Sequence, residues 1–183
     1  IPDLMVMGKG ISSGYAPLAA VAVRDHVRQA FVDAKAAFEH IFTYGGSPVA
    51  AAAGLAVLDI YRREHLAERA AELAPAFASN LNGLREFPIV GDVRTIGFMA
   101  GIEFVADRVT REPFPPGHKV AAMVREAGLR NGIVTYPGTG MATGSSGDII
   151  SLYPPLTFTQ DDIADMGERL RTTFADVTRA LEA

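Results

Sequence analysis

Two short apolar runs lie near the beginning of the chain, separated by a loop rich in glycine and serine. Residues 4–7 (LMVM) and 18–24 (LAAVAVR) are continuously apolar rather than alternating. This pattern is typical of strands buried on both faces of an α/β sheet. The intervening segment 8–17, GKGISSGYAP, has the composition of a loop. We expect two buried strands joined by this loop.

A long helix is predicted over residues 48–69. Pro48 suits the first turn of a helix. The following VAAAAGLAVL carries small or apolar residues on every side, which predicts burial against other elements. From Tyr61 onward the charged sequence YRREHLAERAAEL indicates an exit to the surface or a passage between domains. Pro75 is expected to kink or divide the segment that follows.

The pattern after residue 70 predicts a smaller unit that mixes strands and helices. Its expected elements are two strands within 89–106 punctuated by Gly97 and Gly101, a helix over 118–132, strands at 133–137 and 148–155, and a helix over 157–183. Thr159 is the expected N-cap of this last helix. We therefore assign residues 1–70 to the end of an α/β domain and residues 71–183 to a small α+β domain.

Composition excludes several classes of function. Of the 183 residues, 49% are hydrophobic and 21% charged, as in ordinary globular proteins, and the net charge of −4 gives no support to a nucleic-acid surface. The sequence shows no transmembrane segment, so no membrane partner is expected. There is no cysteine, and the four histidines lack metal-ligand spacing. We expect no metal site and a cytoplasmic location, because the chain fits a reducing compartment.

Lys9 is the single amine in the first apolar segment. A desolvated lysine offers a neutral amine, which can form a Schiff base with an aldehyde cofactor such as pyridoxal phosphate. From its spacing alone, the simpler interpretation is a lysine at a strand end with its ammonium in solvent. Lys35 and Lys119, the other two lysines, lie in amphipathic or polar surroundings and are expected at the surface.

The wider string DLMVMGKGISS resembles the segment that carries the cofactor lysine in class III aminotransferases, which are pyridoxal-phosphate enzymes of fold type I. FTYGGSPVAAAAGLAVLDI resembles the phosphate-binding threonine segment of that family and the helix after it. VGDVRTIGFMAGIEF and YPPLTFTQDDI match the family's C-terminal domain. The resemblance runs along the whole chain in order. It implies the C-terminal part of a fold type I transferase, with the end of the large domain followed by a small α+β domain.

The resemblance also implies roles for two residues. Lys9 would form the Schiff base with pyridoxal 5'-phosphate and then move the proton between the substrate α-carbon and the cofactor. Thr43 would donate its hydroxyl to the cofactor phosphate. In the family this threonine reaches across the subunit interface, so a homodimer with shared active sites is implied.

Other groups that this chemistry needs lie before the lysine in the family. They are a carboxylate for the pyridine nitrogen, a cradle of backbone N–H groups for the phosphate, and an aromatic ring stacked on the cofactor. Only eight residues precede Lys9 here. We expect the chain to be the C-terminal part of a longer enzyme, and to bind the cofactor weakly or not at all by itself.

The expected substrate follows from a missing arginine. Family members that act on amino acids often clamp the substrate carboxylate with an arginine just before the PPL motif. No arginine lies between Arg130 and Arg169. Tyr136 and Ser146 stand near the corresponding positions and are candidate substrate-pocket residues. Arg94 is a weaker candidate for the clamp, and a structural ion pair is its simpler interpretation.

We therefore expect an aminotransferase that moves an amino group from an amine or ω-amino acid to a keto acid. A racemase, epimerase or decarboxylase of the same fold would share the lysine chemistry and stays an alternative. A non-catalytic fragment that serves as an oligomerisation module is a second alternative.

Overall fold

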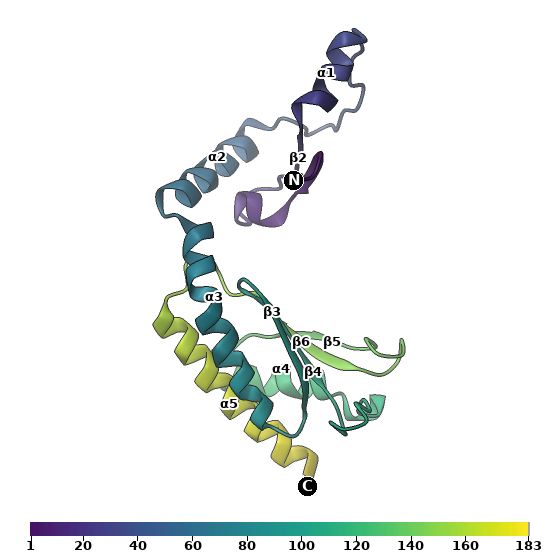
Figure 1. Ribbon diagram of the computed structural model, residues 1–183, viewed down its shortest axis with the longest axis vertical. Helices are drawn as coiled ribbons and strands as arrows, with labels where there is room; N and C mark the ends of the chain where they lie inside the picture. The colour runs from purple at the N-terminus through teal and green to yellow at the C-terminus, as the bar shows by residue number, and fades with distance from the viewer. Residues whose placement is uncertain (183) are drawn as a thin grey trace. The chain divides into compact units, whose positions relative to one another are not determined.

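A computed structural model describes residues 1–182, which divide into two compact units (Figure 1). The first unit comprises Ile1–Leu66, and the second comprises residues 67–182.

The first unit contains one pair of strands and two helices. Strands β1 (Leu4–Met7) and β2 (Ala20–Val23) pair antiparallel, with Leu4 opposite Val23 and Met7 opposite Ala20. The 3-10 turn η1 (Lys9–Ser12) begins the loop between them, and helices α1 (Asp25–Asp33) and α2 (Pro48–Arg63) follow. Both predicted strands are thus present.

The prediction that these strands are buried on both faces is wrong for the described chain. Leu4 and Met5 point to opposite faces of the ladder, and both are exposed. The first unit supplies only two paired strands, and its helix α2 contacts the turn η1 rather than the strands. A continuous apolar run predicts a buried strand, but it does not itself provide the elements that would cover it.

The predicted helix over 48–69 is interrupted. Helix α2 ends at Arg63, and α3 (Leu66–Asn82) begins after His65, whose φ of +48° is left-handed. A left-handed residue cannot continue a right-handed helix, so the break falls here. Pro75 lies inside α3, which continues on both sides of it, so the proline does not divide the helix.

The second unit is built on a four-stranded antiparallel sheet in the order β3-β4-β6-β5. Its strands are β3 (Val90–Ile96), β4 (Met99–Phe104), β5 (Tyr136–Gly138) and β6 (Asp148–Leu152). The two strands predicted within 89–106 are confirmed, and Gly97 forms their turn with φ +53°. The strand predicted at 133–137 begins later, at Tyr136.

Helices α3, α4 (Val120–Arg130) and α5 (Gln160–Glu182) complete the second unit, and Figure 1 shows α3 and α5 side by side. One hydrophobic core joins these helices to the sheet. Its largest fully buried side chains are Phe77, Leu81, Leu84, Ile102, Phe104, Ile150, Leu170 and Phe174.

Helices α3 and α5 approach closely at one glycine. Asn80 of α3 lies over Gly167 of α5, and its Nδ2 donates to the Ile163 carbonyl at 3.2 Å. A methyl group at position 167 would overlap the amide of Asn80. The absence of a side chain at this position therefore sets the distance between the two helices.

Thr159 caps α5 as predicted, in a reciprocal arrangement with Asp162. The Thr159 hydroxyl donates to the Asp162 carboxylate at 2.6 Å, and the Asp162 N–H donates to the Thr159 hydroxyl at 3.2 Å. The Thr159 hydroxyl, joined by the Thr159 backbone N–H, lowers the pKa of Asp162 below its ordinary value of 3.8.

Asp162→Asn is expected to reduce stability near neutral pH but not in acid. Because the pKa of Asp162 is lowered in the folded state, the carboxylate stabilises the fold above pH 3.8. That contribution is lost as the pH falls through the lowered value. Unfolding free energies of both proteins, measured from about pH 6 down to about pH 3, should converge. A difference independent of pH would contradict this role.

Candidate functional site

Lys9 begins the turn η1 directly after strand β1. Its side chain is exposed, and it forms no ion pair within residues 1–182. Its backbone is left-handed, with φ +48°, a conformation that costs a residue with a Cβ roughly 1–2 kcal/mol. The turn must therefore be held by its surroundings. Lys9 lies between two strands, as expected. Its side chain is accessible rather than buried in this chain.

The loop after Lys9 is closed by a buried hydroxyl and by backbone hydrogen bonds. Ser12 is 2% exposed, and its hydroxyl donates to the Ala16 carbonyl at 2.5 Å. The successive backbone bonds run from Ile11 N to Gly8 O at 3.3 Å, from Ser13 N to Gly10 O at 3.1 Å, and from Tyr15 N to Ser12 O at 3.0 Å. The first of these hydrogen bonds, from Ile11 to Gly8, closes the turn around Lys9.

Thr43 lies in the turn that precedes α2, and it is exposed. The N–H of Gly45 donates to the Phe42 carbonyl at 2.9 Å, so this group is already engaged. Within residues 1–182, the N–H groups of Tyr44 and Gly46 donate to no acceptor. The turn thus offers a hydroxyl and two backbone donors to an anion.

Each loop offers a group of the kind that one end of an aldehyde cofactor with a phosphate would need. The accessible amine of Lys9 suits the aldehyde, and the donors around Thr43 suit the phosphate. Both loops border α2, since Thr43 precedes the N-terminus of this helix and the Lys9 turn packs against its side. No hydrogen bond or ion pair joins Lys9 to Thr43 within the described residues.

The two candidate substrate residues lie in the second unit and do not share a cavity. Tyr136 begins β5, opposite Ser151 of β6, and its side chain is 71% exposed. Ser146 lies in the loop between β5 and β6, where its N–H donates to the Thr143 hydroxyl at 3.0 Å. Ser146, but not Tyr136, lines a cavity of about 350 Å³ at the N-terminus of α4.

Arg94 forms structural ion pairs, in agreement with the simpler of the two interpretations of this residue. It donates to Asp92 of the same strand at 2.8 Å and to Glu103 of the neighbouring strand β4 at 2.6 Å. Glu103, and then Asp92, raise the pKa of Arg94, while Arg85 is the main cause of the lowered pKa of Asp92. The guanidinium is engaged by two carboxylates, so it is not available as a clamp.

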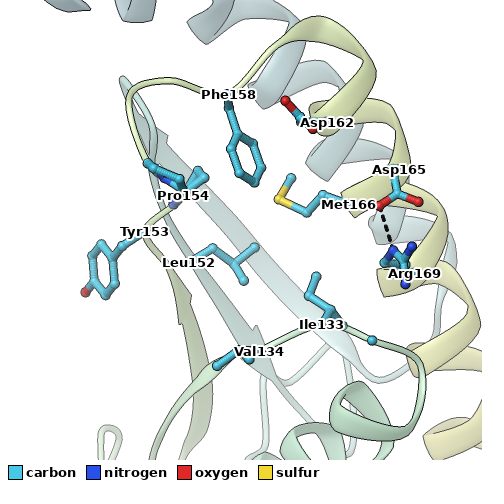
Figure 2. A pocket seen from close by; sticks show the side chains of 12 residues that line it. Ile133, Val134, Leu152, Tyr153, Pro154, Phe158, Asp162, Asp165, Met166 and Arg169 are labelled. Carbon is cyan, nitrogen blue, oxygen red and sulfur yellow. Dashed lines mark hydrogen bonds and ion pairs between the residues drawn. The ribbon is translucent and has the colours of Figure 1, made fainter.

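A larger cavity, of about 430 Å³, lies where β6 ends and α5 begins (Figure 2). Figure 2 shows Leu152, Phe158 and Met166 along its apolar wall, and the ion pair of Asp165 with Arg169 at its edge. This pair is 2.6 Å long and raises the pKa of Arg169. Sequence reasoning missed this cavity, because it forms between residues of β6 and α5 that no local pattern brings together. It contains none of the four predicted site residues.

Within residues 1–182, no cluster of three or more potential metal ligands is present. Over the same residues, every helix is too short or too polar to cross a membrane.

Comparison with known proteins gives consistent results along the chain. The family profile described as Aminotransferase class-III matches residues 1–174. An uncharacterized aminotransferase of Schizosaccharomyces pombe is 36% identical, over 98% of this chain and 39% of that protein. The adenosylmethionine-8-amino-7-oxononanoate aminotransferase of Nitratidesulfovibrio vulgaris is 35% identical, over 97% of this chain and 32% of that protein.

Solved transaminase structures are also similar to this chain, both in fold and in sequence. An (S)-enantioselective omega-transaminase from Thermomicrobium roseum has a TM-score of 0.84 and 36% identity, over 97% of this chain and 38% of that one. A transaminase from the marine bacterium Virgibacillus has a TM-score of 0.90 and 32% identity, over 99% of this chain and 40% of that one. The chain spans about two fifths or less of the length of these relatives.

Proposed function

Because this chain belongs to the class-III aminotransferase family, we propose that the larger protein containing it transfers amino groups with the help of Lys9. The predicted fold class is confirmed by the transaminase structures. The family uses pyridoxal 5'-phosphate, as predicted. The observation that carries the proposal is the accessible, unpaired amine of Lys9 on its turn between two strands. In the whole enzyme, residues 1–70 would end the large domain and 71–183 would form the small one.

Lys9 performs two tasks in the proposed reaction. Its Nζ would hold the cofactor through the aldehyde and, when free, would act as the base that takes the proton from the substrate α-carbon and as the acid that gives it back. When bound, the cofactor supplies an electron sink for the charge that develops at that carbon. The hydroxyl of Thr43, with the free N–H groups of Tyr44 and Gly46, holds the phosphate and so fixes the cofactor's orientation.

The substrate class is part of the proposal. The absence of arginine from residues 131–168, together with the engagement of Arg94 by two carboxylates, favours an amine or ω-amino acid as donor and a keto acid as acceptor. The relative from Thermomicrobium roseum is an omega-transaminase, which supports this choice. Tyr136 and Ser146 remain proposed pocket residues on the substrate side.

The proposed enzyme is a homodimer in the cytoplasm. Thr43 would serve the cofactor held by its partner subunit, as the resemblance to the family implies. The absence of cysteine supports the location. Amino transfer to pyruvate distinguishes this function from racemisation, epimerisation or decarboxylation. A non-catalytic module would transfer none.

Borohydride reduction of the whole protein tests the proposal. The reagent fixes a Schiff base as a stable amine, so a pyridoxyl group should be found on the peptide that contains Lys9. The peptides of Lys35 and Lys119 serve as internal controls. A protein reduced after incubation with the cofactor, yet without a pyridoxyl group on Lys9, would contradict the proposal.

Thr43→Ala is expected to weaken cofactor binding by about 10- to 150-fold, because a hydrogen bond to a charged group contributes about 1.5–3 kcal/mol. Thr43→Ser keeps the hydroxyl and should retain most of the affinity. The measurement is the fraction of cofactor that each protein retains through dialysis. Equal retention by the alanine variant and the wild type would argue against Thr43 as a phosphate ligand.

A further inference from the structure

Helix α2 buries a glycine against the loop that carries Lys9. Within this helix, Ala50, Gly54 and Val57 are buried and share one face. Glycine in a helix interior is destabilising relative to alanine, so its presence at a buried position calls for a packing reason.

The two limbs of the Lys9 loop supply that reason. A Cβ at position 54 would lie 2.6 Å from Leu18 Cδ2, on the limb that leads into β2. It would lie 3.7 Å from the carbonyl oxygen of Ile11, on the limb that leaves Lys9. The bare helix surface at Gly54 therefore lets α2 touch both limbs at once.

The contact at Ile11 reaches Lys9 through the backbone. The N–H of Ile11 donates to the Gly8 carbonyl at 3.3 Å, so the position of Ile11 fixes the residues on both sides of Lys9. Ser12, which follows Ile11, is buried and hydrogen-bonded to Ala16. Lys9 itself has a left-handed backbone, which its own Cβ disfavours. Contacts from outside the turn must hold that conformation.

We propose that Gly54 is a positioning residue for Lys9, holding the lysine turn through Ile11 and Leu18. The proposal deepens the proposed function and rests on it, because the amine that is positioned is the cofactor lysine. Gly54 touches no reacting atom. It acts by allowing a close approach that a side chain larger than a methyl group at this position would disturb.

The proposal predicts a graded response to side-chain size. In Gly54→Ala the methyl group meets the mobile end of Leu18, which can turn away, so the effect is small. In Gly54→Val two further methyl groups must fit into a space bounded by Leu18 and by the Ile11 carbonyl, which belongs to the backbone and cannot turn away. The valine variant should therefore displace the turn, and Leu18→Ala should rescue the alanine variant but not the valine variant.

Amide hydrogen exchange in the whole cofactor-free protein measures this displacement directly. In Gly54→Val, the amides of Ile11, Ser13 and Tyr15 should exchange about 5- to 150-fold faster, the usual range for an overpacked contact. Leu55→Val is the matched control, because it introduces the same β-branched residue at the neighbouring position without added volume. Faster exchange confined to the turn supports the proposal. Unchanged exchange there, a uniform increase over the protein, or an equal effect in the control would overturn it.

Borohydride trapping distinguishes a failure of the Gly54 proposal from a failure of the proposed amino-transfer function on which it rests. If wild type carries a pyridoxyl group on Lys9, Gly54→Val should trap less of it at a given cofactor concentration, and equal trapping would count against positioning. If wild type carries none, the proposed function fails, and the exchange measurement alone decides whether Gly54 holds the turn. Should Gly54→Val not fold, the comparison of Gly54→Ala with and without Leu18→Ala decides the proposal by the same exchange readout.

Discussion

Lys9→Ala in the whole protein is expected to reduce amino transfer by at least about 10²–10⁴-fold, the range contributed by a positioned general acid–base group. The loss should be larger if bond formation to the cofactor also fails. The structure supports this result because Lys9 is the lysine that lies on the turn between β1 and β2, with its amine free of ion pairs within the described residues. Steady-state transfer from an amine to pyruvate measures the effect.

Lys35→Ala provides a closely matched control for this substitution. Lys35 is also exposed and also has a left-handed backbone, with φ +48°. Its replacement removes the same charge and places the same alanine in the same backbone conformation. Activity should therefore be nearly unchanged. Wild-type turnover by the Lys9 variant, or an equal loss in both variants, would show that the chemistry does not depend on Lys9.

Phe174→Ala should lower the free energy of unfolding by about 3–5 kcal/mol, the cost typical of removing a buried aromatic ring. Phe174 lies on α5 and is fully buried. Its ring meets Phe87 and Phe104 edge to face, with centroids 5.8 Å and 5.4 Å apart. The substitution would remove both aromatic contacts and leave a cavity between the helix and the sheet.

Chemical denaturation of the whole protein, followed by circular dichroism, measures this loss. Phe174→Leu keeps an apolar side chain in the core and should cost clearly less. The contrast between the two variants separates the lost volume from any disturbance of α5 itself. A loss below about 1 kcal/mol for the alanine variant would mean that the core of the second unit closes without this ring.

The sequence predicted the second unit better than the first, because the second unit is specified by local signals. Two strand-like runs punctuated by glycine predicted the β3–β4 pair, and Thr159 followed by acidic residues predicted the start of α5. The break at His65 was missed, since no glycine or proline marks it and its left-handed backbone has no sequence signal. Likewise, continuous apolar runs predicted burial of β1 and β2 without showing what would cover them.

Some features of the candidate site could be predicted from the sequence and others could not, because some of them depend on contacts between residues far apart in the chain. Lys9 and Thr43 came from a resemblance to a family, since their spacing alone fits an ordinary surface lysine and a turn threonine. The pairing of Arg94 with Asp92 and Glu103 was foreseeable from charge alternation along two strands. The contact of Gly54 with the Lys9 loop joins residues more than thirty positions apart, so no local pattern could reveal it.

The packing of Asn80 on Gly167 restricts which substitutions positions 80 and 167 of this chain can accept. A single-base change readily turns a glycine codon into one for alanine, but at position 167 the space for the methyl group is filled by the Asn80 amide. A larger residue at 167 therefore requires that the side chain at position 80 become smaller or move away. The two positions, more than eighty residues apart, would evolve as a coupled pair, and the order in which their mutations arise would matter.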